Sequence, residues 1–220
     1  MSGVNSKHLL FEQLARVAKA MASANRLEIL EFLAQGERNV ETLARLTGLS
    51  VANVSQHLQQ LKAVGLVRAR KEGLHVYYSL DNQMAVDLVV ALRAVAERNL
   101  AEVKLILDSY FRVKDNLEPV PAQELWERAK LGLVTVLDVR PPEEFTSGHV
   151  PGAINVTLKD LGKRLKYLKK QKEVIAYCRG PYCVLAFEAV EELRKHGVNA
   201  RRMEDGFPEW KNADLPVEKD

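Results

Sequence analysis

Cysteine is scarce in this chain of 220 residues, which excludes a disulfide-rich scaffold. Cys178 and Cys183 are the only two and lie five positions apart, so we expect a reducing, cytoplasmic setting. The chain also lacks an uncharged apolar run near the ~18 residues of a membrane span. Charged residues interrupt the apolar N-terminus, so we expect neither a secretory signal nor a membrane partner. With 47% hydrophobic residues, this length suits two folded domains.

Positive charge is concentrated in the first half of the chain. The net charge is +3, and residues 1–116 hold 15 Lys and Arg against 12 Asp and Glu, while residues 117–220 hold 17 of each. Between Arg38 and His75 there are six cations and two anions. This local excess is typical of either a solvated basic face or a surface that binds a polyanion.

Apolar spacing in the first half predicts a helix-turn-helix. Helices are expected over residues 7–21 and from there to Gly36, followed by a pair of helices over 40–47 and 50–61. Gly48 suits the end of the first helix in this pair, and Ser50 suits the N-cap of the second. A three-residue turn containing glycine between two helices is the helix-turn-helix spacing.

The next segment predicts a wing and then a long helix. After Gly65 the apolar period changes to two, which indicates a hairpin with its turn at 71–73. Asp81 is then expected to cap a helix that runs to about Phe111, with Met84, Leu88, Leu92, Val95, Val103, Ile106 and Tyr110 facing inward. This helix is too apolar for one small domain to cover, so we expect its remaining face to pack on a second subunit.

The second half predicts an α/β domain. Residues 113–120 are polar with a proline and indicate a linker between domains 1–112 and 121–220. Strands are expected over 134–137, 154–156, 174–177 and 200–203, and helices over 122–130, 158–170 and 184–196. Alternation of strands and helices predicts a mainly parallel sheet, whereas the first domain is mainly α.

The 50–61 helix has an outward face of amides that suits DNA. Ala52, Asn53, Gln56, Gln59 and Gln60 point away from its apolar stripe, and Asn and Gln can bond adenine in the major groove. A polar helix surface without a ligand would have the same composition. The order of helix-turn-helix, basic hairpin and long apolar helix favours a dimeric DNA reader.

Residues 7–110 resemble the ArsR family of bacterial winged-helix repressors. The resemblance is carried by the segments LARLTGLSVANVSQHLQQLKAVGLV and RKEGLHVYYSL. The resemblance implies a homodimer that represses transcription from double-stranded operator DNA. Together with the amide face, it assigns DNA contacts to Ser50, Asn53, Ser55, Gln56, His57, Gln60, Arg68, Arg70 and Lys71. For His57, which lies at the edge of the apolar stripe, packing is the alternative role.

The chain departs from metal-sensing members of that family. Such members carry a pair of cysteines where this sequence reads ETLARLTG, and none is present. In the 84–111 helix, Asp87 and Glu97 are ten positions apart and no His occurs. We therefore expect no metal site and no cofactor, and the regulatory signal must enter elsewhere.

Cys178 lies where a thiol becomes reactive. It follows a predicted strand and precedes a helix that begins near Val184, so backbone N–H groups and the helix N-terminus favour the thiolate. Arg179 adds a positive charge, and Gly180 and Pro181 predict a tight loop. We expect an accessible nucleophile with residues 179–182, Tyr182 included, as its anion-binding loop. The alternative is a buried, inert cysteine.

Residues 120–217 resemble the rhodanese domain of sulfurtransferases through LDVRPPEEFTSGHVPGAINV, YCRGPYC and DGFPEWKNADLPV. The resemblance implies that Cys178 takes sulfur from a sulfane donor as a persulfide and passes it to a thiol acceptor. It gives support roles to Asp138, Arg140, Glu144, His149 and Gly152. Two positions depart from the family. Val184 replaces the Arg that grips an oxyanion in related phosphatases and arsenate reductases, and Cys183 offers a second, resolving thiol.

The two resemblances together leave three hypotheses. The first is a repressor whose rhodanese domain senses sulfane sulfur on Cys178. The second is a sulfurtransferase tethered to DNA or to a partner, and the third is an arsenic oxyanion reductase or sensor, which Val184 disfavours.

Overall fold

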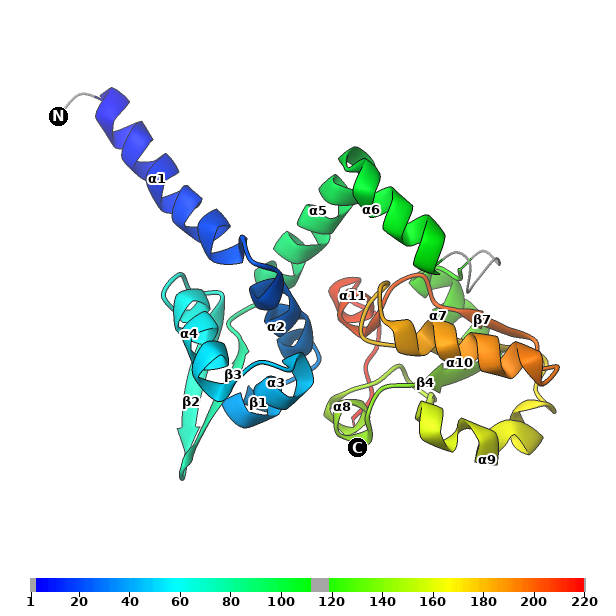
Figure 1. The fold of residues 1–220 in the computed structure, drawn as a ribbon. Helices are drawn as coiled ribbons and strands as arrows, with labels where there is room; N and C mark the ends of the chain where they lie inside the picture. Colours follow the sequence, from blue (N-terminus) through cyan, green and yellow to red (C-terminus); the bar gives the residue numbers. More distant parts are fainter. Residues whose placement is uncertain (1–2, 112–118, 220) are drawn as a thin grey trace. The chain divides into compact units, whose positions relative to one another are not determined.

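The computed structural model describes residues 3–111 and 119–219, which form two compact units, Met1–Val89 and Val90–Asp220 (Figure 1). Almost all of the linker expected over 113–120 lies outside the described residues. None of the described helices is both long and apolar enough to cross a membrane.

The first unit is a winged helix-turn-helix, as predicted. Its helices are α1 (Gly3–Met21), α2 (Ala24–Ala34), α3 (Val40–Thr47), α4 (Val51–Lys62) and the start of α5 (Met84–Asn99). Strands β2 (Val67–Glu72) and β3 (His75–Leu80) form the wing. A short strand that the sequence did not indicate, β1 (Arg38–Asn39), pairs with β3, so the antiparallel order is β1-β3-β2.

Local capping fixes the turn between α3 and α4. The Asn39 side chain accepts a hydrogen bond from the Thr42 N–H at 2.9 Å at the start of α3. Gly48 ends that helix with φ 70°, a conformation that favours glycine. The Ser50 hydroxyl then accepts from the Asn53 N–H at 3.2 Å and caps α4, as its position predicted. Leu58 on α4 is fully buried and anchors this helix in the core.

The prediction of a single helix from residue 82 to Phe111 is wrong. α5 ends at Asn99, because Leu100 adopts an extended conformation with φ −103° and ψ 113°. A short α6 (Ala101–Ile106) and a π-helical turn (Leu107–Phe111) follow. The helix also begins later than a cap at Asp81 predicts, because α5 starts at Met84, whose N–H donates to the Asn82 side-chain oxygen at 3.0 Å.

Much of the face that was expected to point inward from this segment is exposed. Of the residues predicted to face inward, Met84, Leu88, Leu92, Val95 and Ile106 have exposed side chains in the single chain. Val86, which the apolar pattern also places on the inward side, is buried as expected, and the buried Ala85 joins the core of the first unit. The Tyr110 side chain lies outside the described residues.

The second unit contains the predicted α/β domain. Its strands are β4 (Thr135–Asp138), β5 (Ile154–Asn155), β6 (Val174–Tyr177) and β7 (Ala200–Arg202), all parallel in the order β5-β4-β6-β7. Its helices are α7 (Ala122–Lys130), α8 (Pro142–Ser147), α9 (Leu158–Leu168), α10 (Val184–Lys195) and α11 (Phe207–Asn212). The sequence did not indicate the two six-residue helices, α8 and α11.

The central strand β6 has two buried faces. Val174 and Ala176 face a core formed with residues of α9 and α10, whereas Ile175 and Tyr177 face a second core that includes Leu125 of α7. This alternation is the period of two expected for a strand. Cys178 follows the strand directly and belongs to the first of these cores. The sheet therefore delivers the cysteine to the edge where its parallel strands end.

Candidate functional site

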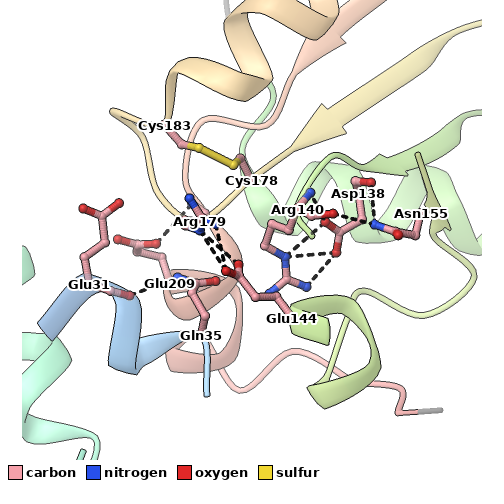
Figure 2. Close-up of a disulfide and its surroundings, with 11 residues drawn as sticks. Glu31, Gln35, Asp138, Arg140, Glu144, Asn155, Cys178, Arg179, Cys183 and Glu209 are labelled. Atoms are coloured by element: carbon pink, nitrogen blue, oxygen red, sulfur yellow. Dashed lines mark hydrogen bonds and ion pairs between the residues drawn. A yellow bond between two sulfur atoms is a disulfide. The ribbon is translucent and has the colours of Figure 1, made fainter. Parts of the chain in front are cut away.

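The two cysteines form a disulfide at the carboxyl end of β6. Cys178 follows the strand, and Cys183 is the N-cap residue of α10 (Figure 2). Their Cα atoms are 6.1 Å apart, inside the limit of about 7 Å for a direct disulfide. The loop 179–182 thus brings the predicted nucleophile and the predicted resolving thiol together.

Both cysteines are buried in this oxidised form. Cys178 is 1% exposed and Cys183 is 9% exposed, among aliphatic neighbours. The expectation of an accessible, charged thiolate is therefore wrong for the disulfide state, because neither sulfur carries a proton or a negative charge there. Tyr182, in the same loop, is 37% exposed. The rim of the loop reaches solvent while the sulfurs lie beneath it.

Arg179 is engaged by a carboxylate. Its Nη2 lies 2.8 Å from Glu144 Oε1, and its Nε lies 3.0 and 3.1 Å from the two carboxylate oxygens (Figure 2). Glu144 is buried on α8, so this bidentate pair holds the loop to a neighbouring element. The prediction of a charge free to stabilise a thiolate needs correction, since Glu144 neutralises much of it.

Backbone contacts fix the loop from within and from α11. The Cys183 N–H donates to the Gly180 carbonyl at 3.0 Å, so this amide faces the loop's own backbone and not an anion. The Phe207 N–H donates to the Cys178 carbonyl at 3.0 Å. Gly206 lies directly against the Arg179–Gly180 peptide, where a Cβ atom would fall closer than 3.0 Å to backbone. The first turn of α11 is therefore a close support of the cysteine loop.

A buried ion pair lies in the loop that follows β4. Asp138 and Arg140 are fully buried and joined by two hydrogen bonds from the Arg140 Nε and one, at 2.6 Å, from its Nη2 (Figure 2). The same guanidinium donates to the Gly148 carbonyl at 2.8 Å, and Asn155 donates to the Asp138 and Arg140 carbonyls. These contacts give both residues the support role that the resemblance implied.

His149 also holds backbone in place. It is buried, stacks on Phe145 with ring centroids 3.7 Å apart, and places Nδ1 3.0 Å from the Phe145 carbonyl. Gly152 adopts φ 73°, and its N–H donates to Glu218 at 2.9 Å. Both residues shape the chain after α8 and lie outside the cysteine loop.

Two residues of α5 that sequence reasoning missed contact this loop, within the unit Val90–Asp220. The Tyr182 hydroxyl donates a hydrogen bond to the Glu97 carboxylate, and the Arg93 guanidinium lies 5.8 Å from the Tyr182 ring centroid. Arg93 also pairs with Glu209 of α11 at 2.9 Å. Burial, and then the bond to Glu97, raise the pKa of Tyr182, so its hydroxyl stays protonated and able to donate. No local pattern could have indicated contacts between residues 85 positions apart.

On the helix-turn-helix, α4 presents the expected amides. Gln56, Gln59 and Gln60 are exposed, and Asn53 and Ser55 are half-buried. Arg26 donates to the Gln60 amide oxygen at 2.6 Å, and Gln59 donates to the Tyr78 hydroxyl at 3.3 Å. Gln60 is thus held by its neighbour, while Gln56 is the most available of the predicted base-reading amides.

His57 packs against α2. Its Nε2 lies 3.5 Å from Asn25 Nδ2, and its Nδ1 is buried without a hydrogen-bond partner among the described residues. Burial, followed by the charge of Arg26, lowers the pKa of His57. These contacts favour the packing role that the sequence left open.

The wing is less positive than the count of charges predicted. Arg70 pairs with Glu37 at 2.7 Å and with Glu72 at 2.6 Å, and Glu37 lies just outside the segment that was counted. The Arg70 hydrogen bond lowers the pKa of Glu37, which keeps that carboxylate charged. Arg68 is exposed and donates to Ser79 at 3.0 Å, and Lys71 is exposed. Arg68 and Lys71 therefore carry the positive charge of the hairpin.

No set of three or more His, Cys, Asp or Glu side chains suited to a metal ion occurs among the residues that the structure describes. The prediction of a chain without metal or cofactor stays a prediction.

Comparison with known proteins identifies both halves. The rhodanese-like domain family matches residues 121–213, and the bacterial regulatory protein arsR family matches residues 23–69. The chain is 42% identical over 213 residues to the HTH-type transcriptional regulator Rv0324 of Mycobacterium tuberculosis, covering 97% of this chain and 93% of that protein.

Two solved structures each resemble one half. One is the homodimeric winged helix-turn-helix DNA-binding domain of Mb0332 from Mycobacterium bovis, a possible ArsR-family regulator. It is 42% identical, covers 46% of this chain and 93% of its own, and has a TM-score of 0.42. The other is a rhodanese-related protein from Thermoplasma volcanium, 30% identical, covering 47% of this chain and all of its own, with a TM-score of 0.43. The match to Rv0324 extends over almost the whole length of both chains, so it includes both domains. The chain therefore belongs to the ArsR family of DNA-binding transcriptional regulators, with a rhodanese-like domain at its C-terminal side.

Proposed function

We propose that this regulator senses sulfane sulfur, which Cys178 captures as a persulfide and Cys183 resolves to a disulfide. The observation that carries the proposal is the pairing of the two cysteines across one loop, with Cα atoms 6.1 Å apart at the end of β6. A resolving thiol at this distance converts a sulfur-carrying loop into a two-state element.

The chemistry balances without a further oxidant. In the reduced loop, the Cys178 thiolate attacks the outer sulfur of a persulfide or polysulfide, a new S–S bond forms, and the donor leaves as a thiolate. The Cys183 thiolate then attacks the Cys178 sulfur, and the outer sulfur leaves as hydrosulfide. The sulfane sulfur gains two electrons, and the two cysteines lose two. A cellular dithiol returns the disulfide to the reduced state by thiol–disulfide exchange.

Contacts around the loop support a link between its chemistry and α5. Tyr182 is adjacent to Cys183 in sequence and donates to Glu97 of α5, and Arg93 of α5 is held by Glu209. α5 begins at Met84, and Ala85 near its start belongs to the core of the winged helix. One continuous helix therefore contains residues of the helix-turn-helix core and residues that contact the sulfur loop. We propose that opening and closing the disulfide acts on DNA affinity through this helix.

Exposed apolar side chains support a homodimer. Leu10, Phe11 and Leu14 of α1 are exposed in the single chain, as are Leu88 and Leu92 of α5. Apolar stripes of this kind mark protein interfaces, and a DNA reader of this class needs two recognition helices at a fixed spacing. We propose that α1 and α5 form the dimer interface. Sedimentation of the purified chain as a monomer at micromolar concentration would exclude it.

The DNA contacts are assigned to exposed or half-buried polar side chains of α4 and to exposed cations of the wing. Within each subunit, we assign base contacts to Asn53 and Gln56 of α4, with Ser50 and Ser55 on phosphates. Arg68 and Lys71 of the wing supply further phosphate contacts. Changing Gln56 to Ala should weaken binding to the operator more than to random DNA, whereas changing Lys71 to Ala should weaken both alike.

Intact mass of the reduced protein after treatment with inorganic polysulfide tests the sulfur chemistry. The wild type should lose about 2 Da as its disulfide forms and should release sulfide, whereas Cys183→Ser should gain about 32 Da and keep it. Cys178→Ser should do neither. Sulfur addition to Cys178→Ser, or none to Cys183→Ser, would contradict the assignment. Repeated turnover with a small thiol acceptor, without any effect on DNA binding, would instead favour a tethered sulfurtransferase.

A further inference from the structure

Helix α9, yellow in Figure 1, has two faces of opposite character. Its four leucines, spaced three, four and three positions apart, bury against the core beside β6; they are Leu158, Leu161, Leu165 and Leu168. Lys159, Lys163 and Lys166 lie on the opposite side at steps of four and three, and Lys170 continues the stripe in the turn that follows. These four lysines are the basic stripe.

The positive charge around this helix is dense and exposed. Residues 158–172 contain seven Lys and Arg and a single acid, Asp160, and all seven cations are exposed. Lys163 pairs with Asp160 at 2.7 Å. The other six make no ion pair with any residue in the described part of the chain. The second half of the sequence has no net charge, so this concentration cannot be seen in a count over the whole domain.

We propose that the basic stripe contacts the phosphate backbone of the DNA to which the regulator is bound. Its four lysines extend over about 16 Å along the helix and the turn after it. Duplex DNA presents one negative charge per ~1.7 Å of its axis, so several phosphates lie within reach of such a stripe. DNA is the polyanion that a helix-turn-helix transcriptional regulator contacts. The stripe adds affinity without sequence preference, because phosphates carry no base identity. This inference does not depend on the sulfur chemistry.

The salt dependence of DNA binding tests this contact on the full-length, reduced protein. The probe is a random-sequence duplex, and the variant is K159Q/K163Q/K166Q, since Gln has nearly the helix propensity of Lys. The slope of log K against log[KCl] should become shallower by up to about 2.7 for each subunit that places the stripe on DNA. Affinity should fall together with the slope.

The matched control K130Q/K195Q/K219Q removes the same charge from exposed positions of the same unit that lie outside α9. It should keep nearly the wild-type slope. Wild-type slope in the stripe variant, or an equal change in both variants, would overturn the proposal. A wild-type slope in the stripe variant would mean that the stripe does not contact DNA, and an acidic protein would then be the partner to test. An equal change in both variants would mean that the slope reports only the net charge of the protein. A thermal melt like that of the wild type verifies that each variant is folded.

Discussion

Replacing Gly206 with alanine places a methyl group against the cysteine loop. Gly206 has φ −109° and ψ −175°, which any L-residue can adopt, so backbone conformation is not the obstacle. The new Cβ would instead fall closer than 3.0 Å to the Gly180 nitrogen and to the carbonyl carbon and oxygen of Arg179. These are backbone atoms and cannot rotate away. The loop or the first turn of α11 must move.

The expected change in the free energy of unfolding of Gly206→Ala combines two opposing effects. Overpacking of this kind costs about 1–3 kcal/mol. Loss of glycine's freedom in the unfolded chain returns about 0.4–1 kcal/mol. The net destabilisation should be about 1–2 kcal/mol, which for a unit of about 130 residues lowers the melting temperature by roughly 3–12 °C.

Calorimetry on the full chain, with and without a reductant, measures this effect. The control is Gly162→Ala in α9, where the new Cβ would meet nothing within 4 Å. That change should leave the rhodanese-like unit unaltered or more stable by up to about 1 kcal/mol, because alanine is the better helix former. If Gly206→Ala melts with the wild type, the close support of the loop by α11 is refuted.

Three further predictions follow from named contacts. Asp138→Ala removes the carboxylate from the buried Arg140 and should destabilise the second unit to urea by about 3–5 kcal/mol, a loss that Arg140→Met in the same chain should partly reverse. Burial lowers the pKa of His57 from 6.5, so the unfolded chain takes up this proton at higher pH than the folded one. Stability of the first unit should therefore fall as pH decreases below 6.5, and His57→Gln should flatten that part of the urea-midpoint profile. Tyr182→Phe removes the bond to Glu97 and should narrow the difference in DNA affinity between the reduced and disulfide forms, while disulfide formation itself persists; an unchanged difference would refute the route through α5.

Local rules were sufficient for most of the fold. Gly48 and Ser50 marked the turn of the helix-turn-helix because φ above zero and N-capping are properties of single residues. The strands of the second unit were found from apolar runs near their observed bounds. The break at Leu100 was missed, because neither Gly nor Pro marks it and both flanking segments favour helix.

The site was predicted only in part, because its contacts join distant segments. The position of Cys178 between a strand and a helix can be read locally, as can the proximity of Cys183. The partners that neutralise a charged side chain cannot be predicted from the local sequence. Arg70 pairs with a residue 33 positions away, and Arg179 pairs with Glu144, 35 positions away. For this reason the sequence overstated both the positive charge of the wing and the free charge beside Cys178.

The DNA affinity of the wild type in its reduced and disulfide forms tests the central claim most directly. Fluorescence anisotropy on a duplex selected from a random library with the reduced protein gives both values under one set of conditions. A coupling of about 1–3 kcal/mol corresponds to a roughly 5- to 150-fold difference in affinity, which should be absent in Cys178→Ser carried through the same polysulfide treatment. Equal affinities of the two wild-type forms would contradict the account.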